Sequence, residues 1–334
     1  MITQAEIAIV GAGPAGATVA RLMAEAGREV LLLHSAQRQV RRLEVLPPGA
    51  SPLVEALGLT RLLARPDIAL PCLGIRRSWA SAGIAFDDFL RRPGGTGHVV
   101  DREAFDAALR DSARLAGARI VEGARLTGAR RVAGGLLMEC GTAVITARFA
   151  VDATGRVGAF ARRLGATRIV DTPLFARRVQ ADATCRAGWL DVAAMPHGWR
   201  YDVSGPGGAR EAWLLSRRAG SAQSSSLAGM ARLDCAAGED WLAIGDAASA
   251  FDPLASQGLW QALASALSAA DTLRASSTTR RPALVQHARR IAETWDRTRL
   301  ELPGIYAGAE RFVDQPFWQV RMRPPPATGR LSLT

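Results

Sequence analysis

Hydrophobic and polar positions near the start of the chain form two short apolar runs separated by an Ala-rich stretch. Residues 6–10 form the first run and end at Gly11, residues 16–26 have the composition of a helix that ends at Gly27, and residues 30–33 form the second run. This order is typical of a β-α-β unit of about thirty residues. Because a helical crossover joins strands that run in the same direction, the chain is expected to begin in a parallel sheet.

The pattern along the rest of the chain predicts mainly strands up to about residue 216 and mainly helices after about residue 257. Helices are also expected at 52–64 and at 101–116, where the residues largely on one face are Phe105, Ala108, Leu109, Ala113 and Leu115. The other expected elements are a hairpin within 72–90, a Gly-rich loop at 94–97, strands near 119–122, 136–139 and 143–151, antiparallel sheet within 176–216, a loop at 219–230 and a C-terminal Pro/Arg tail.

A glycine motif joins the first strand to the first helix. Its residues are Gly11, Ala12, Gly13, Pro14, Ala15 and Gly16, which form a G-x-G-x-x-G. Glycines at this point allow a tight turn and let the backbone approach a pyrophosphate, while the helix N-terminus offers free N–H groups to the anion. An acidic residue is expected after the second strand to hold a ribose, but His34 is there instead. A neutral imidazole can pair with a ribose hydroxyl; the alternative is a solvent-facing His34 without a contact.

A second motif follows a strand-like run at 241–244. It begins Gly245-Asp246-Ala247-Ala248 and continues as Phe251-Asp252-Pro253-Leu254-Ala255-Ser256-Gln257-Gly258-Leu259. Together the two motifs resemble the paired FAD fingerprints of the flavoprotein hydroxylases. That resemblance implies FAD rather than NAD as the bound cofactor, with Asp246 on its ribityl chain and Pro253 beside its ring. It also implies that the helix beginning near Gly258 and Leu259 stabilises negative charge on the flavin.

Three shorter segments agree with this family. Residues 100–106 resemble the segment whose Arg approaches the cofactor, which implies Arg102; the alternative is a helix-capping Asp followed by a surface Arg. Residues 151–156 resemble a strand end near the FAD, which implies Asp152 and Gly155; the alternative is a simple β-turn. Arg42 precedes Leu43-Glu44 where relatives carry a basic residue and Gly-Glu, so Arg42 is implied as a further contact, although Leu43 departs from the pattern.

These elements and motifs predict an α/β fold with three regions. A discontinuous Rossmann-type FAD-binding domain, with a parallel sheet in a three-layer arrangement, is joined by a smaller, mostly antiparallel β-sheet domain on the substrate side and by a C-terminal helical region. The expected residues are 1–70, 98–170 and 236–290 for the first, 71–97 and 171–235 for the second, and 291–334 for the third. Only 88 residues separate Arg156 from Gly245, which is short for this family, so either the substrate domain is reduced or loop segments are missing from the sequence.

Other details favour one branch of the family. Ser256 stands where common aromatic hydroxylases have Gly. The resulting Ser-x-Gly pattern is similar to that of the flavin-dependent halogenases. Residues 197–201 and 311–318 resemble the flavoprotein maturases of the tryptophylquinone enzymes lysine oxidase and quinohemoprotein amine dehydrogenase. The alternative for the aromatic segment 311–318 is core packing against the nucleotide domain. Halogenases need a Lys, and this sequence contains none, so halogenation is disfavoured.

The resemblance implies a single-component, FAD-dependent monooxygenase. Such an enzyme takes electrons from NADH or NADPH in a transient visit and uses O2, through a flavin C4a-hydroperoxide, to hydroxylate an electron-rich aromatic ring. In the maturase branch the aromatic substrate is a Trp side chain of a partner polypeptide, modified during quinone cofactor biogenesis. Two alternatives stay open, a non-catalytic FAD-binding maturation chaperone and an FAD-dependent isoprenoid reductase. The general base is unassigned; His197 is a weak catalytic candidate, and a structural or surface His is the alternative.

Charge and cysteine content limit the partners. The net charge is +11, but all 42 basic residues are Arg and they are scattered. We interpret this as compositional bias, with attraction to FAD phosphates, NADPH or an acidic partner as the alternative, and not as a nucleic-acid interface. The four cysteines form no C-x-x-C pair and no metal site is expected. With no basic N-terminal leader and no long apolar run, a cytoplasmic protein without a membrane span is expected; its oligomeric state is open.

Overall fold

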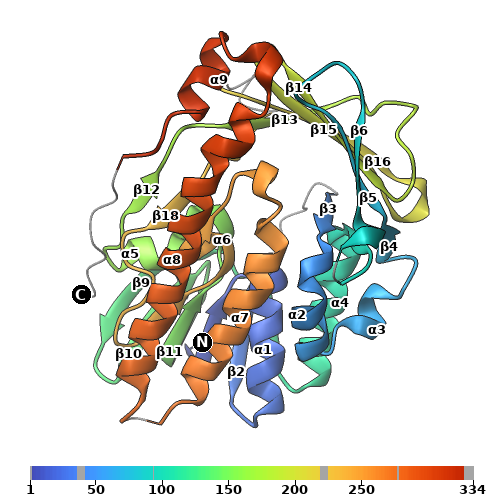
Figure 1. The fold of residues 1–334 in the computed structure, drawn as a ribbon. Coiled ribbons are helices and arrows are strands. Elements are labelled where there is room, and N and C mark those ends of the chain that lie inside the picture. The colour runs from blue at the N-terminus through green and yellow to red at the C-terminus, as the bar shows by residue number, and fades with distance from the viewer. Residues whose placement is uncertain (1, 36–41, 93, 219–224, 277, 327–334) are drawn as a thin grey trace.

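A seven-stranded sheet forms the centre of the larger part of the molecule (Figure 1). The computed structural model describes residues 2–35, 42–92, 94–218, 225–276 and 278–326. The strand order is β8 (Arg119–Glu122), β2 (Val30–His34), β1 (Ile2–Val10), β11 (Ala143–Asp152), β10 (Gly135–Cys140) and β9 (Leu126–Val132), and β19 (Trp241–Ala243) pairs with β11. The pairs among β8, β2, β1, β11 and β19 are parallel, whereas β9, β10 and β11 form an antiparallel meander. The predicted parallel start of the chain is therefore confirmed.

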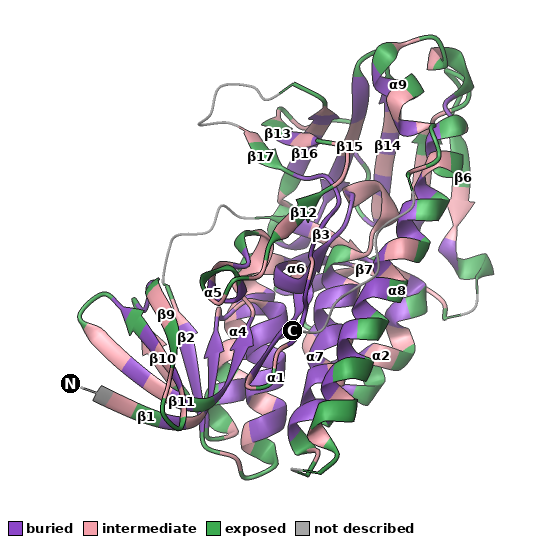
Figure 2. Cartoon of the chain, turned by 90° about the vertical axis from the view of Figure 1, so that its left-hand side faces the viewer, coloured by how far each residue is buried: buried purple, intermediate pink, exposed green. Residues whose placement is uncertain are grey.

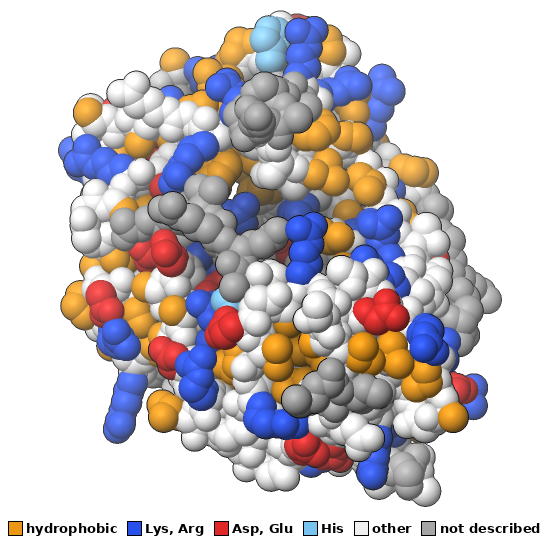
Figure 3. All heavy atoms as spheres, turned by 180° about the vertical axis from the view of Figure 1, so that it is seen from behind, with side chains coloured by type: hydrophobic (Ala, Val, Ile, Leu, Met, Phe, Trp, Pro, Cys, Tyr) orange, Lys and Arg blue, Asp and Glu red, His pale blue; other side chains and the backbone are white. Residues whose placement is uncertain are grey.

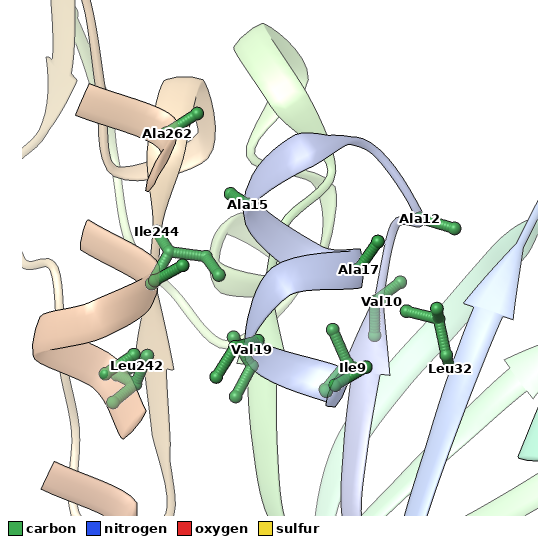
Figure 4. Close-up of a cluster of buried hydrophobic side chains, with 14 of the residues drawn as sticks. Ile9, Val10, Ala12, Ala15, Ala17, Val19, Leu32, Leu242, Ile244 and Ala262 are labelled. Carbon is green, nitrogen blue, oxygen red and sulfur yellow. The ribbon is translucent and has the colours of Figure 1, made fainter. Parts of the chain in front are cut away.

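Helices cover one face of this sheet. α1 (Pro14–Glu25) packs between α4 (Arg102–Leu115) and α7 (Gly258–Arg274), and α8 (Arg280–Ala307) lies beside α7 (Figure 1). Burial of apolar side chains between sheet and helices stabilises this part by roughly 1.5–3 kcal/mol for each large side chain. Figure 4 shows part of this cluster, where Ile9, Val19 and Leu242 of β1, α1 and β19 lie close together. The packing fixes the strand ends from which the motif loops emerge.

A second seven-stranded sheet forms the other part of the molecule. Its order is β17 (Ser225–Leu227), β13 (Phe175–Val179), β16 (Arg210–Ser216), β15 (Gly198–Ser204), β14 (Trp189–Met195), β5 (Gly74–Ser78) and β6 (Ala85–Asp88). All pairs are antiparallel except β14 with β5. A second hydrophobic cluster joins this sheet to the end of α8 and to α9 (Pro316–Arg321) through Trp199, Trp295, Tyr306 and Trp318. Figure 2 shows buried stretches along β14, β15 and α8.

Two three-stranded sheets lie between these parts, and several short helices and turns connect the larger elements. The sheets are β3 (Leu43–Leu46), β7 (Gly97–Asp101) and β4 (Ala69–Cys72), and β12 (Arg168–Val170), β18 (Ala231–Leu233) and β20 (Ser249–Ala250). The short helices are α2 (Ser51–Ala56), α3 (Thr60–Leu63), α5 (Ala159–Arg163), α6 (Gly245–Ala248), and the 3-10 turns η1 (Pro48–Ala50), η2 (Phe89–Arg91), η3 (Gly155–Val157), η4 (Pro206–Gly208), η5 (Pro253–Ala255) and η6 (Glu310–Phe312).

The α/β class with a second, mostly antiparallel sheet and C-terminal helices is confirmed, with differences in detail. The helix expected at 52–64 is divided into α2 and α3, because the chain turns at Gly58, whose φ is +64°. The antiparallel strand β9 was not predicted; it is rich in polar residues and lacks a clean alternation. Residues 225–227 form β17 rather than loop, while 219–224 and the tail from 327 lie outside the described residues.

Two further expectations have different outcomes. Leu115 is 90% exposed at the last residue of α4, so its expected place on the buried face is wrong. Among the described residues, no helix has both the length and the apolar character needed to cross a membrane. The boundaries of the three regions stay a prediction.

Candidate functional site

The glycine motif lines one side of a groove at the carboxyl ends of β1 and β2. Gly11 has a φ of +108°, and a Cβ there would lie 2.2 Å from the carbonyl oxygen of Ala153. A Cβ on Gly16 would lie 1.9 Å from the carbonyl oxygen of Gly11, so this glycine lets α1 pack against the turn. Gly13, in contrast, has no heavy atom within 4 Å of where a Cβ would be. The first and third glycines are thus required by the fold, and the second faces open space.

The groove has a volume of about 460 Å³ and gathers most of the residues implied by the two motifs and the shorter segments. They are Gly11, Ala12, Gly13, Pro14, Ala15, His34, Arg42, Arg102, Gly155, Gly245, Asp246, Gly258 and Leu259. Three implied residues lie elsewhere: Gly16 packs beneath the turn, Asp152 is buried below the groove, and Pro253 lines a neighbouring cavity. The groove also contains Arg125 and Arg163, which the sequence did not single out.

Asp152 supports the groove from below. Its carboxylate is fully buried and accepts hydrogen bonds from the backbone N–H groups of Thr154 (2.9 Å), Phe160 (3.1 Å) and Ala161 (2.8 Å). Burial raises the pKa of Asp152, and these donors oppose the rise. The carboxylate therefore holds the turn that contains Gly155 in place, with its acceptor capacity directed to the chain itself.

Four charged residues form a network beside the groove. Arg102 donates to Glu44 (2.7 Å) and to both carboxylate oxygens of Asp106 (3.0 and 2.9 Å), while Arg42 lies 3.3 Å from Glu44. Burial disfavours the charge on Arg102, but the two carboxylates outweigh it and keep its pKa above the usual value. Burial by itself would raise the pKa of Glu44, but Arg102 and Arg42 outweigh it and hold that pKa below the usual value. Arg102 is therefore a half-buried, paired cation and not a free surface residue.

A second cavity of about 500 Å³ opens from the same groove. The two share Arg42, Glu44, Asp246, Gly258 and Leu259. Aromatic side chains contribute much of the wall, namely Trp79, Trp199, Tyr201, Trp213 and Phe251. Trp79 and Trp199 meet edge to face with ring centroids 6.4 Å apart, a favourable aromatic geometry. Figure 3 shows the molecule hollowed on one face, with Arg side chains beside the opening.

A buried polar network holds one end of this cavity. Asp252 is 1% exposed, and its Oδ2 accepts hydrogen bonds from Tyr306 Oη (2.7 Å) and Arg321 Nη1 (3.1 Å). Trp199 in turn donates through Nε1 to Tyr306 Oη (3.2 Å). Burial raises the pKa of Asp252, and Arg321 opposes that rise. The C-terminal helices thus fix the loop that begins at Asp252.

That loop contains a residue in the left-handed region. Ser256 has a φ of +50° and is the one non-glycine residue with positive φ among those described. Such a conformation costs a side-chain-bearing residue about 1–2 kcal/mol and costs glycine much less. The glycine that common aromatic hydroxylases carry here therefore suits the backbone better than Ser256 does.

Comparison with known proteins agrees with this geometry. Residues 4–197 match the family described as "FAD binding domain". The chain belongs to this family. Over 220 residues it is 27% identical to the tryptophan 2-halogenase of Chondromyces crocatus (59% of this chain, 40% of the relative), and over 129 residues 33% identical to the menaquinone reductase of Mycolicibacterium smegmatis (37% and 30%). The matches thus span less than half the length of these relatives.

Solved structures of other flavin-dependent enzymes share the fold of this chain. The peptidyl tryptophan dihydroxylase QhpG, essential for tryptophylquinone cofactor biogenesis, has a TM-score of 0.78 at 24% identity, covering 98% of this chain and 80% of its own. The flavin-dependent halogenase CmlS has a TM-score of 0.81 at 21% identity, covering 96% and 68%. These similarities confirm the expected resemblance to the hydroxylase and halogenase fold.

The groove suits the FAD that the family binds. Its open space lies above Gly13, beside the N-terminus of α1, where a pyrophosphate gains from free N–H groups. Asp246 presents a carboxylate at the far end, 3.4 Å from Arg156 Nε. We expect these groups to hold the diphosphate and the sugar-alcohol arm respectively.

His34 stands at the end of β2, where an acidic residue was expected. His34 lines the groove, and its Nδ1 lies 2.7 Å from Oε2 of Glu122, which occupies the paired position on β8. In a neutral imidazole, a carboxylate that accepts from the Nδ1–H leaves Nε2 as an acceptor. The carboxylate beside His34 thus belongs to the adjacent strand β8, and the contact of His34 with a ribose stays a prediction.

The His34–Glu122 pair gives a testable expectation. We expect His34→Ala to weaken FAD affinity about 10-fold, because a ribose hydroxyl loses its acceptor. Glu122→Gln is expected to weaken it less, and His34→Glu, which restores an acidic side chain, to retain most of it. Dissociation constants from quenching of flavin fluorescence measure the effect; equal affinity for all four proteins would contradict a cofactor role for His34.

The catalytic candidate His197 lies away from both cavities. It is exposed in the turn between β14 and β15 and lines neither of them. The C-terminal aromatic segment packs mainly against the second sheet, where Trp318 donates to the carbonyl of Met195 (2.9 Å) and contacts Trp79. Sequence reasoning missed the wall residues Trp79 and Trp213, whereas Trp199 and Tyr201 lie in the segment 197–201 that the resemblance singled out. Trp79 follows β5 and Trp213 lies on β16, so neither belongs to a local motif.

Proposed function

We propose that the protein is an FAD-dependent monooxygenase that uses NADH or NADPH and O2 to hydroxylate an electron-rich aromatic ring. We further propose that this ring is the Trp side chain of a partner polypeptide. The observation that carries the proposal is the aromatic cavity that opens directly from the groove suited to FAD, with Arg42, Glu44 and Asp246 at their junction. The fold shared with QhpG supports this branch.

The chain's own residues would place and enclose the substrate. Bound FAD supplies the redox chemistry by which O2 is activated. Trp79, Trp199 and Trp213 line the cavity and would give an aromatic ring apolar surroundings from which water is excluded. The network of Asp252, Tyr306 and Arg321 keeps the adjoining loop in one position, so that a ring in the cavity lies at a fixed place relative to the groove.

Halogenation is the competing activity within the family, since one relative is a tryptophan 2-halogenase. The implied halogenase chemistry needs a Lys amine to carry or position the hypohalous species, and the 334 residues contain none. The guanidinium of Arg stays protonated and is a poor nucleophile. Hydroxylation is therefore the better supported proposal.

The test measures reduction and oxygen transfer separately. Purified protein with FAD is mixed anaerobically with NADH or NADPH, and the flavin absorbance is followed. O2 and a Trp-containing tripeptide are then added, and the mass of the peptide is measured by mass spectrometry. We expect flavin bleaching and a mass gain of oxygen, with Trp79→Leu lowering the product yield and increasing peroxide release. Trp189→Leu, which changes a Trp outside both cavities, is the matched control. Flavin that neither nicotinamide reduces would contradict the proposal.

A further inference from the structure

A third pocket lies beside the groove and carries concentrated positive charge. It has a volume of about 660 Å³, is open to solvent, and is lined by Val157, Ala159, Arg162, Arg163, Ala166, Thr167 and Arg168. The three arginines come from α5 and from the start of β12, within seven residues of one another. Neither FAD fingerprint includes any of them.

These arginines have backbone partners in place of carboxylates. Arg162 donates to the carbonyl of Val157 (3.5 Å), Arg163 to those of Thr127 (3.1 Å) and Ala159 (2.8 Å), and Arg168 to those of Ala247 (2.7 Å) and Asp246 (2.9 Å). In the described part of the chain, none of the three lies within 4.0 Å of a carboxylate oxygen. Their charges therefore remain uncompensated by any direct ion pair.

The like charges affect one another. Burial, together with the nearby Arg156 and Arg162, lowers the pKa of Arg168 to about 10, although Asp246 opposes the shift. Arranging cations in this way raises the free energy of the protein by itself. An anion bound among them would gain that energy back and would accept forked hydrogen bonds from guanidinium groups.

The pocket is continuous with the proposed flavin site. Val157, Ala159 and Arg163 line both the pocket and the groove, and Arg168 bonds to the carbonyl of Asp246 itself. Residues 155–157 form a single turn that touches all three cavities, since Arg156 lines the aromatic one. A ligand held in the pocket by one end can therefore extend along this turn toward the flavin.

We propose that the arginine pocket binds the phosphorylated ribose of NADPH. This inference rests on the proposed function, because it names the site of the reductant that the function needs. A phosphate monoester carries a charge of about −1.5 to −2 near neutral pH, more than each phosphate of the pyrophosphate linkage. The pocket therefore discriminates NADPH from NADH, which lacks this group.

The experiment uses the FAD-loaded full chain and two independent measurements. Calorimetry gives the affinities of 2′,5′-ADP, 5′-AMP and inorganic phosphate, and anaerobic stopped-flow spectroscopy gives the concentration dependence of flavin reduction by NADPH and NADH. The variant is Arg162→Glu, which changes an exposed residue whose one hydrogen bond is long. The control is Arg130→Glu, an exposed arginine of β9 that lines none of the three cavities.

We expect 2′,5′-ADP to bind at least about 10-fold more tightly than 5′-AMP, and Arg162→Glu to reduce that preference and the NADPH preference by about 10-fold. Both variants should keep their FAD content and their reduction by saturating NADH. Equal effects of the two variants, or none, would overturn the proposal. Inorganic phosphate binding as tightly as 2′,5′-ADP would also overturn it, in favour of a free-phosphate site. If neither nicotinamide reduces the flavin but 2′,5′-ADP binds through Arg162, the proposed function fails and the nucleotide site stands.

Discussion

Arg321→Met is expected to lower the free energy of unfolding by about 3–5 kcal/mol, the usual cost of leaving one charge of a buried pair without its partner. Arg321 is 8% exposed, and its guanidinium contacts Asp252, the carbonyl of Pro173 and the ring of Tyr306. Because Asp252 starts the loop along the aromatic cavity, the variant is also expected to retain FAD poorly. Chemical unfolding and the flavin-to-protein ratio measure the two effects. Arg323→Met, an exposed neighbour, is the control.

A second substitution separates charge from packing in this pair. We expect Asp252→Asn to recover part of the stability lost in Arg321→Met, because the double variant has neither buried charge. Strictly additive losses would show that Arg321 acts by packing alone. The cost of Arg321→Met should also grow with pH. Without Arg321, the pKa of Asp252 in the folded protein lies still further above its value in the unfolded chain. A carboxyl with a raised pKa lowers the free energy of unfolding as the pH rises from the unfolded-state pKa through the folded-state pKa.

Gly13→Ala and Gly16→Ala are expected to fail in different ways. A Cβ on Gly16 meets the Gly11 carbonyl at 1.9 Å, so that variant should lose about 3 kcal/mol of stability through overpacking. Gly13 has a φ of −78° and open space around it, so the apoprotein should tolerate alanine. Its FAD affinity should nevertheless fall about 100-fold, because the methyl group occupies the space proposed for the pyrophosphate.

Gly49→Ala is the matched control, since Gly49 also has open space around it and lies outside the groove. Thermal unfolding of the apoproteins and FAD titration give the two quantities for each variant. If Gly13→Ala binds FAD as tightly as the unchanged protein, the diphosphate does not lie over the motif and the proposed orientation of the cofactor is wrong.

Most of the predicted nucleotide-binding region could be recognised from local sequence. The G-x-G-x-x-G turn and the Gly245-Asp246 strand end are short signals whose backbone geometry requires particular residues, and the structure brings both into one groove. Their contact with FAD stays a prediction. The α/β class was predicted from the strands and helices around these motifs. Their hydrophobic periodicity can be read within a short stretch of sequence.

The rest depends on residues that meet only after folding. Arg321 and Asp252 are 69 positions apart, and His34 and Glu122 are 88 apart. Register between β2 and β8 brings the second pair together, and neither strand alone indicates it. Likewise, Trp79 and Tyr201 reach one cavity from separate strands of the second sheet or its connections. A single sequence gives no signal for such long-range contacts.

The course of α8 limits how the two halves of the molecule move. This helix contributes Ala288 and Ile291 to the first hydrophobic cluster and Trp295 and Tyr306 to the second. A helix resists sharp bending because each bend breaks backbone hydrogen bonds, except where proline has already removed one. Pro303 is inside α8, just before the turn that lines the aromatic cavity. Movement at the mouth of the aromatic cavity is therefore limited to the last turns of α8. A hinge rotation of the whole second sheet would require this helix to break.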